Sequence, residues 1–213
     1  MLLFVTGASG SGKTTVIPGL KKKLPAFAIH DFDERGVPDD ADSRWRQRET
    51  EYWISQAIEY QHQGRDTVIC GGAVYGEILA CPSITQIDHL AVCLMDCPDN
   101  ERLRRIRGRG GEPTMDILAW AAWLRVHAED PTWCPEVITD NSYDSMHWKH
   151  WRSWASDDPR WQQLVIETGG KKKVDQIVAL VAKWIEQQVK RSYQNATLVT
   201  HPDQDDMFSA DDS

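Results

Sequence analysis

The chain has 213 residues, of which 41% are hydrophobic and 26% charged, and its formal net charge is −8. This length allows one α/β domain with a substantial core but is short for two. The acidic balance argues against broad, sequence-independent nucleic-acid binding, which depends on many Lys and Arg contacts to phosphate. The five cysteines form no C-x-x-C pair, no apolar stretch is long enough for a bilayer, and the N-terminus lacks a signal-peptide pattern. We therefore expect a reduced, cytoplasmic protein.

Short apolar runs alternate with amphipathic segments along the chain. The pattern predicts strands over 2–6, 26–30, 67–70, 90–95 and 163–167. It predicts helices from about residue 12, over 43–63, over an Arg-rich stretch ending at 108, over 114–129 and over 174–190. Pro18 and Gly19 predict that the first helix is kinked or short. Strands that alternate with helices imply an α/β fold, with a parallel sheet of about five strands and helices on both faces.

The domain organisation follows from composition. Residues 1–191 are expected to form one domain, and the polar, acidic tail 192–213 is expected to be disordered because it lacks any hydrophobic period. Trp148, Trp151 and Trp154 stand three apart and would form an aromatic ridge on a helix. Such a ridge either packs against the core or forms a wall or cap over a binding site.

The stretch GASGSGKTT, which follows the first predicted strand, fits the pattern G-x-x-x-x-G-K-[ST]. Its glycines let the backbone curl so that successive N–H groups face one anion, and the following helix adds its N-terminal donors. Lys13 would reach the β- and γ-phosphates, and the Thr14 hydroxyl would ligate Mg²⁺. The alternative is a turn that only resembles this motif. The candidate nucleotide-binding residues are Gly7, Ala8, Ser9, Gly10, Ser11, Gly12, Lys13, Thr14 and Thr15.

A phosphate loop alone does not separate kinases from ATPases, GTPases or transporters. Four further stretches narrow the choice: HDFDE at 30–34, WRQRE at 45–49, VICGGA at 68–73 and LMDCPDNERLRRIRGRG at 94–110. Together with the loop they resemble the small P-loop kinases of metabolites and nucleotides, the shikimate, gluconate, adenylylsulfate and nucleoside-monophosphate kinase group. The resemblance covers about residues 1–130 and resumes at 163.

This resemblance implies a three-layer P-loop fold with a lid over about 102–130, and an ATP- and Mg²⁺-dependent kinase. A carboxylate near the acceptor hydroxyl can orient it and take its proton. The resemblance gives that role to Asp33 and puts Asp31 on the Mg²⁺ side, with their strand beside the phosphate loop. The alternative for both aspartates is a helix cap or a solvated turn.

Other candidate site residues have two interpretations each. Arg46 would hold an acidic or phosphorylated acceptor through a bidentate contact, or it lies on a solvated helix face. Gly71 and Gly72 would let the acceptor approach the backbone closely, or they form an ordinary turn. Five arginines lie between residues 102 and 109. Of these, Arg105 and Arg109 are the candidates for stabilising the developing charge on the transferred phosphoryl group.

Residues 131–161 depart from the compact kinases of this group, and Ala73 stands where the group has a third glycine. Both differences argue against shikimate itself as the acceptor. The leading hypothesis is a kinase for a hydroxyl of a small metabolite, antibiotic or nucleoside-type acceptor. The alternatives are a 5′-hydroxyl nucleic-acid kinase and a non-catalytic, nucleotide-gated regulatory ATP-binding protein. The acceptor, the preference for ATP over GTP and the oligomeric state stay open.

Overall fold

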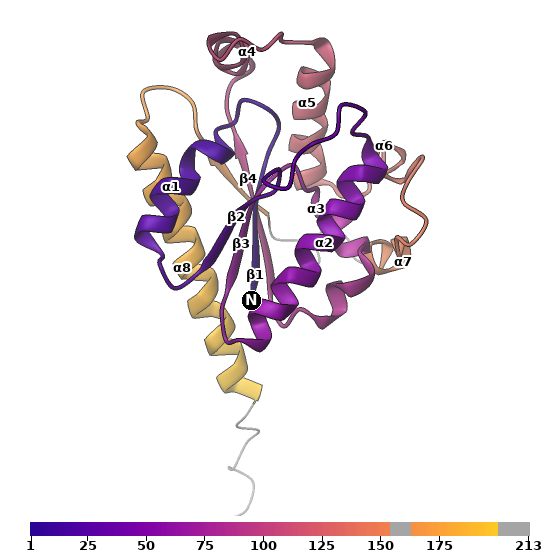
Figure 1. Ribbon diagram of the computed structural model, residues 1–213, viewed down its shortest axis with the longest axis vertical. Helices are drawn as coiled ribbons and strands as arrows, with labels where there is room; N and C mark the ends of the chain where they lie inside the picture. The colour runs from indigo at the N-terminus through magenta and orange to yellow at the C-terminus, as the bar shows by residue number, and fades with distance from the viewer. Residues whose placement is uncertain (154–162, 200–213) are drawn as a thin grey trace, which may run out of the picture.

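The computed structural model describes residues 1–153 and 163–199. Within these residues, five parallel strands form one sheet in the order β2-β3-β1-β4-β5 (Figure 1). The strands are β1 (Leu2–Thr6), β2 (Ala28–Asp31), β3 (Thr67–Gly71), β4 (Leu90–Asp96) and β5 (Gln163–Glu167). The α/β class and the parallel five-stranded sheet predicted from the sequence are confirmed.

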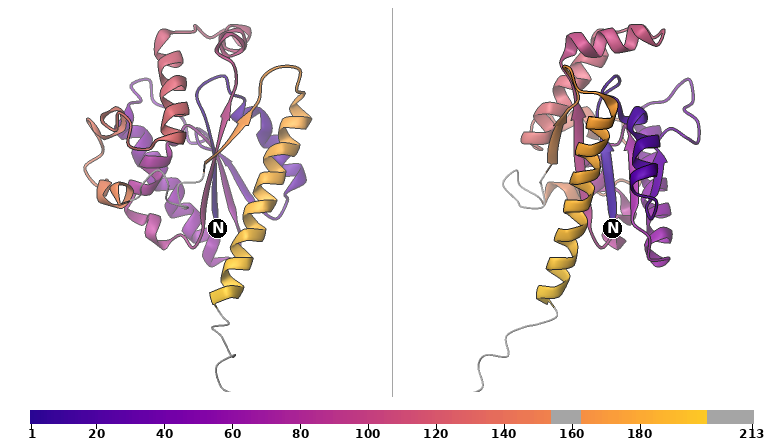
Figure 2. Two further views of the ribbon diagram at one scale, coloured as in Figure 1. Left: turned by 180° about the vertical axis from the view of Figure 1, so that it is seen from behind. Right: turned by 90° about the vertical axis from the view of Figure 1, so that its left-hand side faces the viewer.

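Helices cover both faces of this sheet (Figures 1 and 2). They are α1 (Lys13–Lys23), α2 (Ser43–His62), α3 (Tyr75–Ala80), α4 (Asp99–Gly108), α5 (Met115–Glu129), α6 (Glu136–Thr139), α7 (Trp148–Arg152) and α8 (Val174–Val199), with a 3₁₀ turn η1 (Pro82–Gln86). One hydrophobic cluster joins the sheet to α1 and α8, and a second joins it to α2, α3, α5 and α7. The molecule therefore has three layers.

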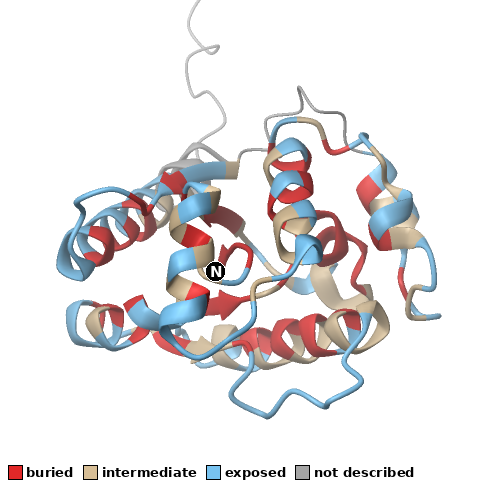
Figure 3. Ribbon diagram, turned by 90° about the horizontal axis from the view of Figure 1, so that it is seen from above, coloured by how far each residue is buried: buried red, intermediate tan, exposed pale blue. Residues whose placement is uncertain are grey.

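The first strand shows why the apolar run at the N-terminus forms the centre of the sheet. All five of its residues are buried. Leu2 and Phe4 belong to the cluster with α2, α3 and α5, whereas Leu3 and Val5 belong to the cluster with α1 and α8. Side chains alternate between faces along a strand, so a strand covered on both faces reads as a continuous apolar run. Figure 3 shows buried residues recurring among exposed ones along the helices on both sides of the sheet.

Because all the strands are parallel, their carboxyl ends share one edge of the sheet, where ligands bind in open α/β sheets. The phosphate loop follows Thr6 at this edge, and Asp31 ends β2. The sequence analysis expected the strand that carries Asp31 to lie next to the phosphate loop. This is wrong, because β3 lies between β2, which ends at Asp31, and β1, which the phosphate loop follows. The crossover from β1 to β2 skips a position that β3 later fills.

Helix α1 continues through Pro18, whereas the sequence predicted a short or kinked helix. Pro18 and Thr14 are both exposed, so water can bind the carbonyl that loses its helical partner. The neighbouring Gly19 has a packing role: a Cβ there would lie 2.7 Å from a methyl group of Val178 on α8. A larger residue would push the two helices of this layer apart.

Several boundaries differ from the sequence prediction. Helix α8 extends to Val199, so the tail expected from residue 192 begins with helix; residues 200–213 lie outside the described residues, as do Trp154 and Trp161. The segment 102–130, expected as a lid, divides in two. Helix α5 places Trp123 and Leu124 in the core, so only the part around α4 and the following loop remains a candidate lid. Within the described residues, no helix is long and apolar enough to cross a membrane.

Candidate active site

The phosphate loop has the backbone that its glycines predict. Gly7, Gly10 and Gly12 all have positive φ angles, of 149°, 82° and 100°, which side-chain-bearing residues rarely adopt. A Cβ at Gly7 would lie 2.3 Å from the carbonyl oxygen of Met95, so no larger residue fits between the loop and β4. Gly12 caps α1 without a side-chain hydrogen bond, which leaves the first N–H groups of the helix for an anion.

Lys13 points its ammonium group back into this loop. Its Nζ donates to the carbonyl oxygens of Gly7, at 2.6 Å, and Ala8, at 3.1 Å. Burial lowers the pKa of Lys13 to about 8, although the negative charge of Asp33 works in the opposite direction. A polyphosphate would supply the negative charge that this desolvated cation lacks. The uncapped helix and the inward-pointing ammonium group therefore fit ATP.

The residues expected to hold Mg²⁺ are Thr14 and Asp31. Thr14 is exposed in the first turn of α1, and Asp31 ends β2. The Asp31 carboxylate accepts a hydrogen bond from the backbone N–H of Asp33 at 3.0 Å, which fixes the turn after the strand. Hydroxyl and carboxylate oxygens are the donors that Mg²⁺ prefers. In residues 1–153 and 163–199, no group of three or more His, Cys, Asp or Glu side chains gathers as a metal site.

Asp33 is exposed, but protein atoms still crowd its carboxylate. Partial desolvation raises the pKa of Asp33, the neighbouring Asp31 adds to this rise, and Lys13 opposes it. Asp33 likewise acts on the pKa of Lys13. These reciprocal effects show that the carboxylate and the ammonium group of the phosphate loop share one electrostatic environment, although β3 separates their strands.

The two glycines after β3 have different surroundings. A Cβ at Gly71 would lie 1.8 Å from the Cβ of Phe32, so this glycine is required where two chain segments touch. A Cβ at Gly72 would have no atom within 4 Å among the described residues. Gly71 therefore serves packing, and only Gly72 faces open space at the carboxyl edge.

Arg46 makes the bidentate contact that its position on α2 predicts, but with a carboxylate of the protein. Its Nε and Nη2 donate to the two carboxylate oxygens of Glu77 on α3, at 2.8 and 2.7 Å. Gln47 donates a further hydrogen bond to Glu77 at 3.0 Å. Burial alone would lower the pKa of Arg46, but the charge of Glu77 outweighs it and raises the pKa. The Arg46 guanidinium also lies 4.9 Å from the centre of the Trp120 ring.

The arginines of α4 divide into buried and exposed groups. Arg105 donates to the carbonyl oxygens of Gly10 and Thr168, at 3.1 and 2.7 Å, and pairs with Glu101. It thus joins the phosphate loop to the loop after β5. Arg109 is exposed and donates to the Ser9 hydroxyl at 2.5 Å. Of the two arginines chosen from the sequence, Arg109 therefore has the freer guanidinium.

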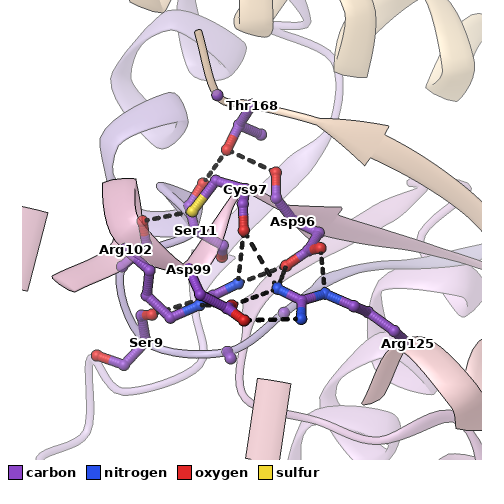
Figure 4. Close-up of polar contacts among 12 residues, drawn as sticks. Ser9, Ser11, Asp96, Cys97, Asp99, Arg102, Arg125 and Thr168 are labelled. Carbon is purple, nitrogen blue, oxygen red and sulfur yellow. Dashed lines mark hydrogen bonds and ion pairs between the residues drawn. The ribbon is translucent and has the colours of Figure 1, made fainter. Parts of the chain in front are cut away.

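A network that the sequence analysis did not identify supports the loop from below (Figure 4). Arg102, which is fully buried, donates to the Ser9 carbonyl at 2.7 Å and pairs with Asp96 at the end of β4. Arg125 on α5 donates to Asp96 at 2.7 Å and to Asp99 at 2.5 Å. Figure 4 shows both guanidinium groups converging on the Asp96 carboxylate. The sequence signal that could have predicted this network is Asp96, an acidic residue at the carboxyl end of a central strand.

The tryptophan-rich segment packs mainly against the core. Trp151 is 3% exposed and lies against Gly76, His127 and Trp148. His127 accepts a hydrogen bond from the Gly76 N–H at 3.2 Å, and burial lowers its pKa to about 3. The described part of the ridge therefore supports the packing interpretation; Trp154 lies outside the described residues.

Comparisons with known proteins give a structural answer and no sequence answer. No family model matches the chain, and no curated protein sequence matches it. A sugar kinase from Janibacter sp. HTCC2649 superposes with a TM-score of 0.52 at 14% identity, over 87% of this chain and 94% of that chain. The tunicamycin resistance protein of Deinococcus radiodurans superposes with a TM-score of 0.53 at 13% identity, over 86% of this chain and 94% of that chain. At such identities the likeness concerns the fold, and this chain has the fold of the small P-loop kinases.

Proposed function

We propose that this protein is an ATP- and Mg²⁺-dependent kinase that transfers the γ-phosphoryl group to a hydroxyl of a small molecule. The observation that carries the proposal is the geometry of the carboxyl edge of the sheet: Lys13 points into a phosphate loop before a helix without a side-chain cap, and Asp31 and Asp33 follow β2 at the same edge. A cation that binds the phosphates and a carboxylate within reach of its field are the two groups that in-line transfer to a hydroxyl needs.

On the nucleotide side, the N–H groups of the loop and of the first turn of α1 bind the phosphate oxygens. Lys13 leaves the carbonyls of Gly7 and Ala8 and binds the β- and γ-phosphates. Thr14 and Asp31 would hold Mg²⁺, directly or through water, and the ion would supply positive charge for the phosphates there.

On the acceptor side, Asp33 orients the hydroxyl and takes its proton. A carboxylate whose pKa is raised is a better proton acceptor than an ordinary aspartate, and this is the direction in which Asp33 is shifted. The open space at Gly72 is where the acceptor approaches the backbone.

The arginines have separate roles in this proposal. Arg109, exposed beside Ser9, swings toward the transferred phosphoryl group and stabilises its charge. Arg105 positions the phosphate loop, because its donors are bound to the carbonyls of Gly10 and Thr168 and to Glu101. This differs from the catalytic role expected for Arg105 from the sequence.

The test is an ADP-release screen across sugars, nucleosides, amino alcohols, antibiotics and 5′-hydroxyl oligonucleotides, with ATP and Mg²⁺. Acceptor-dependent release with a small molecule supports the proposal. Release only with oligonucleotides, weakened by salt, would favour the nucleic-acid kinase instead. Tight ATP binding without acceptor-dependent release from any compound would favour the regulatory ATP-binding protein.

A further inference from the structure

We call the part of the site formed by α2, α3 and the turn after β2 the α2 side. There, Arg46 is bound to a buried carboxylate of the same protein, that of Glu77. Glu77 is fully buried and the Arg46 side chain is 19% exposed. Two hydrogen bonds join Arg46 to both carboxylate oxygens, and Gln47 adds another. Gln47 is itself held by the Ile138 carbonyl at 2.9 Å. The pair is therefore fixed from three elements.

The positive charge of Arg46 is neutralised by Glu77 and is therefore not free for a ligand. If Arg46 turned to bind a carboxylate or phosphate of a ligand, the charge of Glu77 would stay buried without its cationic partner. Removing one partner from a buried ion pair is strongly unfavourable. Arg46 is therefore a poor receptor for an anionic acceptor, although Nη1 donates no hydrogen bond within the described residues and remains available to a neutral oxygen.

The other arginines on this side are also matched by carboxylates or lie at the surface. Arg35 pairs with Glu49 at 3.1 Å, and Arg44 pairs with Asp144 at 3.0 Å. Arg48 is exposed. Asp31 and Asp33, in contrast, form no ion pair among the residues that the structure describes, so this side presents two carboxylates without an ion-pair partner, while Lys13 directs its ammonium group into the phosphate loop. Like charges disfavour an anionic ligand there.

Aromatic rings border the same region. The Arg46 guanidinium lies over the Trp120 ring. The Trp45 ring lies edge-on to that of Phe32, with 6.0 Å between the ring centres, and Phe32 is the residue between Asp31 and Asp33 in the sequence. Both tryptophans are partly buried against the core. Such rings offer apolar contact area to an uncharged ring or chain, with hydrogen-bonding groups nearby.

We propose that the acceptor is an uncharged hydroxyl compound, and that the Arg46–Glu77 pair selects against acceptors that carry a carboxylate or a phosphate. This inference rests on the proposed function and names the substrate class of the same site. It reverses the role that the sequence predicted for Arg46.

The first experiment compares acceptors in pairs that differ in charge: glucitol with gluconate, methyl shikimate with shikimate, and a nucleoside with its 3′-monophosphate. Whichever pair is turned over, we expect kcat/KM for the neutral member to be at least about 10-fold higher. Preference for the anionic member would overturn the inference while leaving the kinase proposal intact. The absence of ADP release from every member would count against the kinase proposal itself.

The second experiment reads the state of Arg46 without any acceptor. In the full-length protein, phenylglyoxal should modify Arg46 at least about 10-fold more slowly than Arg104, whose side chain is 75% exposed, as followed by peptide mass spectrometry. Glu77→Gln should raise the rate at Arg46. Equal rates at Arg46 and Arg104 in the unmutated protein would show that the guanidinium is free, and would overturn the inference even if no acceptor is found.

The third experiment links the two readouts. Glu77→Gln should shift the ratio of kcat/KM for neutral over anionic acceptor toward the anion by about 10-fold, because Arg46 regains an uncommitted charge. The matched control is Glu51→Gln, on the same helix as Arg46, which removes a carboxylate that accepts a hydrogen bond from Ser83 and should leave the ratio unchanged. If Glu77→Gln does not fold, the comparison of Arg46 with Arg104 in the unmutated protein remains the test of the pair. A preference that is unchanged in a folded Glu77→Gln variant would contradict the proposed role of the pair.

Discussion

The two sides of the candidate site handle charge differently. On the phosphate side, Lys13 and Arg109 direct their donors to oxygen atoms of the loop, and neither forms an ion pair among the described residues. On the α2 side, Arg35 and Arg46 are each bound to a carboxylate of the protein. The loop therefore keeps positive charge without a carboxylate partner, which the proposed nucleotide would supply, whereas the two arginines of the α2 side are already paired.

The difference has a structural cause. On the phosphate side, the loop is one continuous stretch after β1, whose backbone N–H groups and lysine are positioned by local geometry, and Arg109 reaches it from the end of α4. The α2 side is assembled from α2, α3, α5 and the ends of two strands, so its charges meet partners that lie far away in the sequence. Variants on each side should then differ in kind: those on the phosphate side remove binding of charge, and those on the other side disturb packing and selection.

The largest effect is expected from Lys13→Met, which removes the cation of the phosphate side. Acceptor-dependent ADP release should fall by about 10³-fold or more, in the range seen when a charge that stabilises phosphoryl transfer is lost. The fold should survive, because a desolvated ammonium group with a lowered pKa does not stabilise the native state. Lys21→Met, exposed on the same helix, is the control. Full activity of Lys13→Met would remove the basis of the mechanism.

Arg102→Met tests whether the loop depends on the buried network beneath it. Arg102 is completely buried and holds both Ser9 and Asp96; because Arg125 still pairs with Asp96 in the variant, the cost comes from the lost hydrogen bonds and the unsatisfied Ser9 carbonyl, about 1–3 kcal/mol. We expect a loss of this size in the free energy of unfolding, measured with urea. Arg104→Met, exposed on the same helix, should change it by less than about 0.5 kcal/mol. Similar values for both variants would mean that the network adds no stability.

Asp33→Asn asks whether the coupled carboxylate acts in the transfer step. Loss of a general base lowers a rate by about 10²-fold or more, so kcat should fall by this factor while the KM for ATP changes little. Asp39→Asn, in the exposed loop before α2, should leave kcat unchanged. A rate near that of the unmutated protein would assign Asp33 to the turn and not to the chemistry.

The smallest effect expected concerns the packed aromatic cluster on the α2 side. Burial lowers the pKa of His127 from 6.5 to about 3. Between pH 6.5 and about 3, His127 is therefore protonated in the unfolded chain and neutral in the folded protein. Stability is therefore full above pH 6.5 and falls as the pH decreases, by up to about 1.4 kcal/mol per pH unit. Between pH 6.5 and 5 the loss should reach about 2 kcal/mol.

His127→Gln, which keeps an acceptor for the Gly76 N–H, should flatten this part of the pH profile, measured by thermal or urea unfolding. His62→Gln, exposed at the end of α2, should not alter it. The carboxylates with lowered pKa values, Asp99 and Glu101, lose their contribution only at lower pH, so they do not obscure the comparison. An equal slope in the His127 variant would show that the imidazole does not limit acid stability.

The sequence was most informative where structure depends on neighbouring residues. The apolar run 2–6, the glycines of the loop and the helical pattern over 114–129 each depend on neighbouring positions, and the structure has β1, the phosphate loop and α5 where these signals place them. It was least informative for α3, a helix of six residues that is too short to show a hydrophobic period. Glu77, the partner of Arg46, lies on that helix.

By itself, then, the sequence determined the α/β alternation, the phosphate loop and the candidate residues that follow each strand, because these are local patterns. Only the tertiary structure decided that β3 separates Asp31 from the phosphate loop, that Arg102 and Arg125 share Asp96, and that Arg46 is already neutralised by Glu77. The physical reason is that a charged side chain acquires its role from its partners. In this protein Arg125 lies 29 positions from Asp96, Arg46 lies 31 positions from Glu77 and Arg44 lies 100 positions from Asp144, on elements that folding alone brings together.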